Sequence, residues 1–174
     1  MQAKEIQTAV AEYLVKNGHE AVCENFGHTV FEMDVAALSK SGMLQEYEIK
    51  ISRSDFLCDK NKRRHWMLAK FDMYAMPSGH EFKCPNYFCY VCPAGLIKIT
   101  EIPVYAGLWY CTDGVVSIIR KAKKIHKIPA EREIILKKML RMTVQRKYLG
   151  CTMLTYQNRE LARRWEETEN YKKA

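Results

Sequence analysis

Apolar and polar residues alternate in two segments, 31–38 and 46–51, on either side of the polar sequence Ser39-Lys-Ser-Gly-Met43. Alternation with a period of two is typical of β-strands that bury one face. Two such strands joined by a short segment that contains glycine form a β-hairpin. The sequence therefore predicts a hairpin with a fixed register, because a slip of one residue would exchange its buried and polar faces.

The charged residues of this hairpin are predicted to lie on one face. If position 41 is the centre of the turn, paired residues have numbers that sum to 82, so Asp34 lies opposite Glu48 and Glu32 lies opposite Lys50. Opposed carboxylates repel each other unless positive charge lies between them. Mg²⁺ commonly takes one or two carboxylates, several waters and substrate phosphate oxygens, and Asp34 with Glu48 could supply the carboxylates. The pattern is equally typical of an ordinary hairpin with an exposed, salt-bridged polar face.

The remaining pattern predicts an α/β fold. Helical spacing predicts a helix over 3–16 that ends at Asn17-Gly18, and a polar helix that follows Ser52 and is capped by Ser54. Other elements are expected as strands at 20–24, 87–91, 102–111 and 115–120, turns at 25–27 and 112–114, and helices at 131–149 and 153–171. We expect a single domain over 1–174, with a core at about 3–120 and a basic helical C-terminal extension at about 121–174. Its three layers are a central mixed sheet that contains the hairpin, the N-terminal helix on one face and later helices on the other.

Composition is that of a globular protein. Hydrophobic residues make up 48% of the chain and charged residues 28%. The start of the chain lacks the apolar run of a secretory signal, and no apolar segment is long enough to cross a bilayer. We therefore expect a cytoplasmic protein that does not bind membranes. Its seven cysteines are irregularly spaced, which favours reduced thiols over a disulfide framework.

The positive charge is concentrated in two segments. The net charge is +8, and residues 120–147 hold eleven Lys and Arg against Glu131 and Glu133. A second basic run, Lys60-Asn-Lys-Arg-Arg64, follows the hairpin, and His65 after it could contact a phosphate or be an ordinary surface histidine. Clusters of this kind are expected for a polyphosphate partner, although a solvated helix face produces the same pattern.

Three cysteines have a spacing that invites a metal interpretation. Cys84, Cys89 and Cys92 follow the pattern C-x4-C-x2-C. If 87–91 is a strand, however, Cys89 and Cys92 point to opposite faces of the sheet. We expect buried thiols and no iron–sulfur cluster.

The order of elements around the charged hairpin resembles the core of the PD-(D/E)XK nuclease superfamily, also called restriction-endonuclease-like. The resemblance covers about residues 3–105 and rests on Asp34, on Glu48-Ile-Lys50 and on the polar helix that follows. The stretch Ser52-Arg-Ser-Asp-Phe56 further resembles MmcB-type DNA-repair proteins and small phage-borne relatives. The proline that the family name places before the aspartate is missing here.

This resemblance implies a metal-dependent nuclease. It implies that Asp34 and Glu48 bind Mg²⁺, for which Mn²⁺ can substitute, and that Lys50 serves the attacking water. A carboxylate of the first helix would join the metal site, with Glu5 preferred over Glu12, although both are equally explained as exposed helix charges. The residues expected to hold the DNA are Ser52, Arg53, Ser54, Lys60, Lys62, Arg63 and Arg64.

The expected function is thus hydrolysis of DNA phosphodiester bonds in repair, recombination or phage DNA processing. The alternatives are a non-catalytic nucleic-acid-binding module of the same fold and a protein-interaction factor from a mobile element. The sequence leaves open the geometry of the DNA substrate, the choice between DNA and RNA, and whether the protein forms a homodimer.

Overall fold

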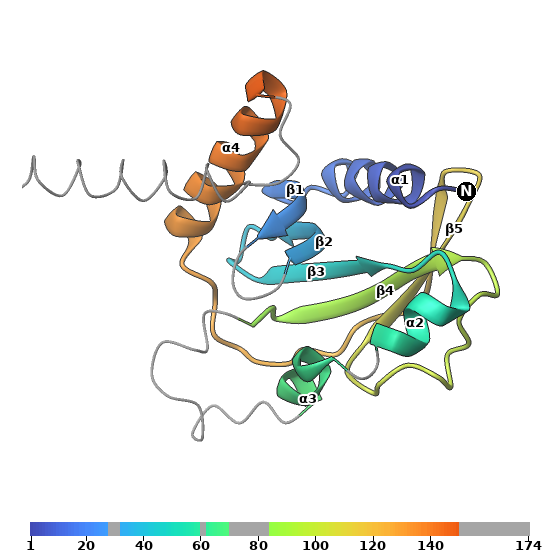
Figure 1. Cartoon of the computed structure of the whole chain (residues 1–174). Coiled ribbons are helices and arrows are strands. Elements are labelled where there is room, and N and C mark those ends of the chain that lie inside the picture. Colours follow the sequence, from blue (N-terminus) through green and yellow to red (C-terminus); the bar gives the residue numbers. More distant parts are fainter. Residues whose placement is uncertain (28–31, 60–61, 70–83, 150–174) are drawn as a thin grey trace, which may run out of the picture. The chain divides into compact units, whose positions relative to one another are not determined.

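Six strands in the described part of the chain form one mixed sheet, in the same order as in the sequence (Figure 1). The computed structural model describes residues 1–27, 32–59, 62–69 and 84–149. The strands are β1 (Ala21–Gly27), β2 (Glu32–Leu38), β3 (Leu44–Ile49), β4 (Tyr87–Pro93), β5 (Gly107–Thr112) and β6 (Val115–Arg120). Neighbouring strands are antiparallel except for β3 with β4 and β4 with β5, which are parallel.

Helices cover both faces of this sheet. The covering helices are α1 (Ala3–Lys16), α2 (Arg53–Asp59) and α3 (Arg63–Ala69), and a fourth helix, α4 (Arg132–Leu149), follows the last strand in the sequence. Helix α1 lies on one face, and α2 and α3 lie on the other (Figure 1). The predicted three-layer α/β arrangement with a central mixed sheet is therefore confirmed.

The predicted hairpin forms in the predicted register. Val35 pairs with Tyr47, and Leu38 pairs with Leu44, so paired numbers sum to 82 as expected. The turn is closed by the backbone N–H of Ser39, which donates to the carbonyl of Met43 over 3.0 Å. Gly42 has a φ of +78°, a left-handed conformation that glycine adopts without steric cost.

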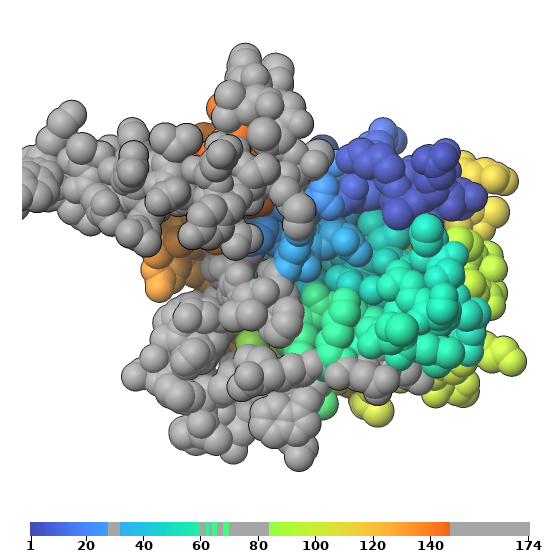
Figure 2. All heavy atoms as spheres, in the orientation of Figure 1, coloured from blue at the N-terminus to red at the C-terminus, as the bar shows by residue number. Residues whose placement is uncertain are grey.

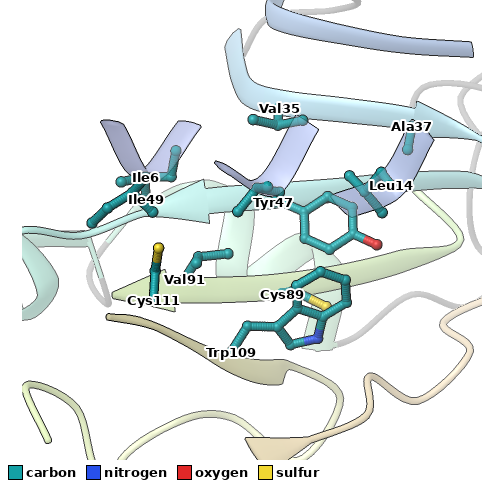
Figure 3. Packing of buried hydrophobic residues seen from close by; sticks show 11 residues of the cluster. Ile6, Leu14, Val35, Ala37, Tyr47, Ile49, Cys89, Val91, Trp109 and Cys111 are labelled. Atoms are coloured by element: carbon teal, nitrogen blue, oxygen red, sulfur yellow. The ribbon is translucent and has the colours of Figure 1, made fainter. Parts of the chain in front are cut away.

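The α1 face of the sheet is an apolar core. Ile6, Val10 and Leu14 of α1 are fully buried against the odd-numbered side chains of the hairpin. Figure 3 shows Ile6 and Leu14 pointing from α1 toward Ile49 and Tyr47. Burial of each such side chain contributes roughly 1.5–3 kcal/mol to folding. Of the apolar residues expected on this face, Ile51 lies beyond β3 and is exposed, and Phe31 falls outside the described residues.

The structure corrects two boundaries near the start of the chain. Residues 25–27, expected as a turn, belong to β1, where Phe26 is fully buried. The expected continuous helix after the hairpin is two short helices, and Ser52 rather than Ser54 caps the first, because the backbone N–H of Asp55 donates to Ser52 Oγ over 3.2 Å.

A third correction concerns β5, which begins at Gly107 rather than at residue 102. Pro103 has no N–H to give to a sheet. The guanidinium of Arg120 donates instead to the carbonyl of Ala106 over 3.0 Å and to that of Pro103. A side chain at 107 would not fit, because its Cβ would lie 2.6 Å from Cys89 Sγ.

The chain divides into two compact units, Met1–Leu140 and Arg141–Ala174. The first unit therefore extends beyond the expected core boundary at about 120 and includes the basic segment 121–127 and the first half of α4. The predicted helix 153–171 lies outside the described residues. Over the ranges given above, no helix is both long enough and apolar enough to span a bilayer.

Candidate active site

The charged face of the hairpin is not a solvated surface. Glu46 and Glu48 project from alternate positions of β3, and Lys50 follows directly after the end of the strand. All three are buried, and Lys50 has only 3% of its surface exposed. Helices α2 and α3 lie over them, and the turquoise atoms of α2 form part of the outer surface below α1 in Figure 2. The part of the polar face formed by Glu46, Glu48 and Lys50 is therefore salt-bridged but buried under two helices, whereas Glu32 of β2 is exposed.

Asp34 lies where the backbone pairing of β2 and β3 ends. Its Oδ2 accepts a hydrogen bond of 2.7 Å from the backbone N–H of Ile49, which takes the place of a strand-to-strand bond. Burial and the nearby charge of Glu48 raise the pKa of Asp34 to about 6. Asp34 and Glu48 are therefore close enough to repel each other, as the register predicted.

Lys50 is surrounded by carboxylates. Its Nζ lies 2.9 Å from Glu48 Oε1, 3.4 Å from Asp59 Oδ1 and 3.5 Å from Asp55 Oδ1. Burial alone would lower the pKa of Lys50, but the charges of Glu48, Asp59 and Asp55 outweigh it and raise the pKa. The side chain is therefore an ammonium ion at neutral pH.

Arg64 was expected on the surface among the DNA-binding residues, and the structure places it in the interior. Only 5% of its surface is exposed, and its Nη1 donates to Glu46 Oε1 over 2.6 Å. Its Nη2 lies 3.1 Å from Glu48 Oε2, and the guanidinium covers the ring of Phe88 at 5.2 Å. Arg64 thus neutralises buried carboxylates and is not a surface cation that could hold a phosphate backbone.

Asp59 and His65 complete the cluster. No role was expected for Asp59, and His65, which was expected to contact a phosphate or to be a surface histidine, is buried. Asp59 is fully buried, and its Oδ2 lies 2.6 Å from His65 Nε2 and accepts a hydrogen bond of 2.9 Å from Tyr90. His65 Nδ1 lies 2.8 Å from the hydroxyl of Tyr105. Burial raises the pKa of Asp59, but hydrogen bonds from His65 and Lys62 and the charge of Lys50 outweigh it, so the pKa falls far below its usual range.

Helix α1 contributes an amide near Asp34 rather than the expected carboxylate. Glu5 Oε2 accepts a hydrogen bond of 2.7 Å from the backbone N–H of Gln2, and Glu12 is an exposed partner of Lys16 at 3.6 Å. Helix α1 packs on the apolar face, so the structure does not bring either glutamate to the cluster.

Gln7 is the residue of α1 that reaches the site. Its buried Nε2 donates to the backbone carbonyl of Asp34 and to Asn25 Oδ1, both over 2.6 Å. Asn25 continues the β1–β2 register opposite Asp34 and has a φ of 45°, which is unusual for a residue other than glycine. Gln7 could have been identified from the sequence, because it is a polar residue next to Ile6 on the predicted buried side of the first helix.

The other described residues expected to bind DNA have partners within the protein. Ser52 Oγ lies 3.1 Å from Ser54 Oγ. Arg53 donates to both carboxylate oxygens of Glu101 over 2.7 and 2.6 Å. Lys62 is half exposed, with its Nζ 2.6 Å from Asp59 Oδ1. Lys60 and the side chain of Arg63 lie outside the described residues.

The carboxylates of the cluster fit Mg²⁺ better than a metal that takes three or more ligands from protein side chains. Among the described residues, no group of three or more His, Cys, Asp or Glu side chains is arranged to hold a metal. Mg²⁺ does not require such a group, since two carboxylates with waters and substrate oxygens suffice. Asp34 and Glu48 are such a pair.

The balance of charge in the cluster also favours a divalent cation. Five carboxylates oppose three lysine and arginine side chains among the described side chains of the cluster, which leaves an excess of two negative charges when these eight groups are ionised and His65 is neutral. The carboxylates are Asp34, Glu46, Glu48, Asp55 and Asp59, and the cations are Lys50, Lys62 and Arg64. Burial raises the pKa of Glu46 to about 8; the charge of Arg64 opposes the rise, and those of Glu48, Asp34 and Asp59 add to it. A divalent cation would balance the charge.

The cysteines of the C-x4-C-x2-C pattern are separated as predicted. Cys89 belongs to the apolar cluster under α1, and Cys92 belongs to the cluster on the other face. Cys84 and Cys111 are also buried free thiols. Burial raises the pKa of Cys89 to about 12 and that of Cys92 to about 11.

Comparison with known proteins supplies a fold and no function. No protein-family model matches the chain, and no curated protein matches it. A solved structure of the SPO1766 protein of unknown function from Silicibacter pomeroyi is similar, with a TM-score of 0.62 and 22% sequence identity. The match covers 84% of this chain and 89% of that one.

Proposed function

We propose that the protein is a Mg²⁺-dependent nuclease that hydrolyses DNA phosphodiester bonds. The observation that carries the proposal is the buried pair of Glu48 and Lys50 at 2.9 Å, beside the point where β2 and β3 separate and Asp34 accepts from the backbone of Ile49. The charges of both residues act on the carboxyl group of Asp34. Two repelling carboxylates beside a buried ammonium ion are a costly arrangement, and perturbed groups of this kind concentrate at functional sites. The resemblance to PD-(D/E)XK nucleases agrees with the same three residues.

In this proposal Asp34 and Glu48 hold Mg²⁺, which would polarise the phosphate and lower the pKa of a bound water. Lys50 keeps its proton, because the charges of three carboxylates favour the ammonium form. Its role is therefore to orient the water and to stabilise the negative charge that develops on the phosphate, rather than to act as a base.

The strand would be held by exposed cations. Lys62 lies at the exposed rim of the buried cluster. Lys121, Lys123, Lys124 and Lys127 are exposed in the segment between β6 and α4, and Lys124 also lies over the ring of Tyr87 at 5.8 Å. We place the activity in the cytoplasm, since the described cysteines are free thiols.

The decisive test compares Asp34→Asn with Glu32→Gln on circular and linear DNA, with Mg²⁺ and with EDTA. Asp34→Asn should abolish cleavage and leave salt-dependent DNA binding intact, because only a metal ligand is lost. Glu32 is exposed on the same hairpin, so Glu32→Gln should cleave like the wild type. Cleavage by Asp34→Asn at the wild-type rate, or wild-type cleavage that persists in EDTA, would refute the proposal.

A second candidate is a nucleic-acid-binding module without catalysis. The ion pairs of Arg64 and Lys50 favour it, because they neutralise Glu46 and Glu48 without a metal. Calorimetry separates the two candidates. A nuclease should bind Mg²⁺ or Mn²⁺ with heat that disappears in Glu48→Gln, whereas a binding module should bind DNA with a strong salt dependence and give no such heat.

A further inference from the structure

Asp59 differs from the other buried acids of the cluster in how its two oxygens are used. Oδ2 lies 2.6 Å from His65 Nε2 and 2.9 Å from the hydroxyl of Tyr90. Oδ1 faces cations, with Lys62 Nζ at 2.6 Å and Lys50 Nζ at 3.4 Å. One oxygen is thus anchored by polar groups of the interior, and the other is directed at ammonium groups.

The groups behind Asp59 are themselves fixed. Tyr90 extends from β4 and packs edge-on against Phe56 and Phe88. His65 stacks on Tyr90 and reaches the hydroxyl of Tyr105 at 2.8 Å. The carboxylate of Asp59, the last residue of α2, is therefore fixed by one side chain of β4 and one of α3.

Burial of a carboxylate without any exposed surface is expensive, and ion pairs repay the cost only when the geometry is well defined. Glu48 contacts Lys50 at 2.9 Å and Asp55 contacts it at 3.5 Å, so the ammonium is held among three acids, one from β3 and one from each end of α2. The position of Lys50 is then set by β3 and by α2 together.

We propose that Asp59 is a positioning residue that fixes the Lys50 ammonium for the reaction, and that His65 and Tyr90 fix Asp59. This inference rests on the proposed nuclease function, because it assigns Lys50 a part in catalysis. Asp59 itself acts through Lys50 and does not contact the substrate.

The kinetic test compares Asp59→Asn with Glu20→Gln. Glu20 is a partly buried acid that accepts a hydrogen bond of 2.8 Å from Arg132 outside the cluster, whereas Asp59 is an ion partner of Lys50. Asp59→Asn should lower kcat by about 100-fold with KM unchanged, as expected when a catalytic group is displaced by about 1 Å. Glu20→Gln should stay within about twofold of the wild type. Equal losses in both variants, or no loss in Asp59→Asn, would overturn the inference. Glu46→Gln is the control for the spectrum described next, because Glu46 is buried and paired with Arg64 like Asp59.

A measurement that does not depend on DNA cleavage distinguishes the positioning role of Asp59 from the proposed nuclease function. A proton–nitrogen NMR spectrum of lysine ammonium groups should contain a slowly exchanging Lys50 signal, identified by its loss in Lys50→Arg. The signal should disappear in Asp59→Asn and persist in Glu46→Gln; persistence in both would refute the positioning role even if the wild type cleaves DNA. If the wild type does not cleave DNA, the nuclease proposal fails, while this spectrum still decides whether Asp59 orders Lys50.

Tyr90→Phe provides a milder variant in case Asp59→Asn does not fold. It removes one hydrogen bond to Asp59 and keeps the ring that packs on Phe56 and Phe88. A lost neutral hydrogen bond is worth about 1 kcal/mol, so kcat should fall by about fivefold. An unchanged kcat together with an unchanged Lys50 signal would contradict the inference.

Discussion

The two faces of the sheet use alternate residues of the same strands for opposite purposes. The odd-numbered residues of β3, Tyr47 and Ile49, pack under α1 in an apolar cluster. The even-numbered residues, Glu46 and Glu48, are just as buried but lie among charges supplied by α2 and α3. Hydrophobic burial is non-directional and tolerant of small shifts, whereas a buried charge is stable only with its particular partners.

The contrast indicates which face carries function. The apolar face contributes stability and positions the strands. The ionic face costs free energy wherever its pairing is incomplete, and that cost is expected where chemistry requires it. Substitutions on the two faces should therefore differ both in magnitude and in their dependence on pH.

The largest effect is expected for Arg64→Ala. The change leaves Glu46 and Glu48 buried without their guanidinium partner, so the free energy of unfolding should fall by about 3–5 kcal/mol. Chemical denaturation at pH 7 in EDTA measures the loss. The double variant Arg64→Met with Glu46→Leu should recover part of it, because an apolar pair needs no counter-charge. A loss below about 1 kcal/mol would mean that water or other cations replace Arg64.

On the apolar face, Leu14→Ala should remove about 2–4 kcal/mol by leaving a cavity between α1 and the hairpin. This loss should be the same at pH 5 and pH 8, because no titratable group is exposed by the change. Denaturation at both pH values checks the prediction. A pH-dependent loss would show that the two faces are coupled through the sheet.

Asp34→Asn should stabilise the protein in EDTA at pH 8. The pKa of Asp34 rises from 3.8 in the unfolded chain to about 6 in the fold. Its ionised form therefore destabilises the fold, fully above pH 6 and not at all below pH 4. The asparagine variant should gain about 2 kcal/mol at pH 8 and nothing near pH 3.5. A gain that is independent of pH would contradict this origin.

Asn25→Ala should cost about 1 kcal/mol, since it loses the hydrogen bond from Gln7 and places alanine at a positive φ. Asn25→Gly loses the same hydrogen bond without the backbone strain and should cost less. The difference between the two melting temperatures measures the strain opposite Asp34. Equal costs would indicate that the backbone relaxes there.

The smallest effect is expected for Glu12→Gln, which should change both stability and cleavage by less than the error of measurement. Glu12 is exposed, and its partner Lys16 lies 3.6 Å away on the same helix, an arrangement of little energetic weight. A marked loss of cleavage would restore the expectation that a glutamate of α1 joins the site.

The local pattern predicted more of the fold than of the site. The α1 boundaries, the register of β2 with β3, the Asp113-Gly114 turn and the separation of Cys89 from Cys92 followed from periodicity and turn chemistry. The start of β5 and the continuation of β1 through residue 27 did not, because each depends on partners distant in sequence. The guanidinium of Arg120, for example, can donate to the carbonyl of Ala106, before β5, only after the sheet has formed.

The sequence by itself determined that Asp34, Glu48 and Lys50 share one face, because the side-chain period of a strand is two and the turn fixes the register. Only the tertiary structure decided that this face is buried and that Arg64, His65 and Asp59 enter it. Their role depends on how two short helices lie across the sheet, and residues in a basic, polar run look solvent-exposed until that packing is known. Their burial changes Arg64 from a surface cation into an interior counter-ion and makes Asp59 a neighbour of Lys50.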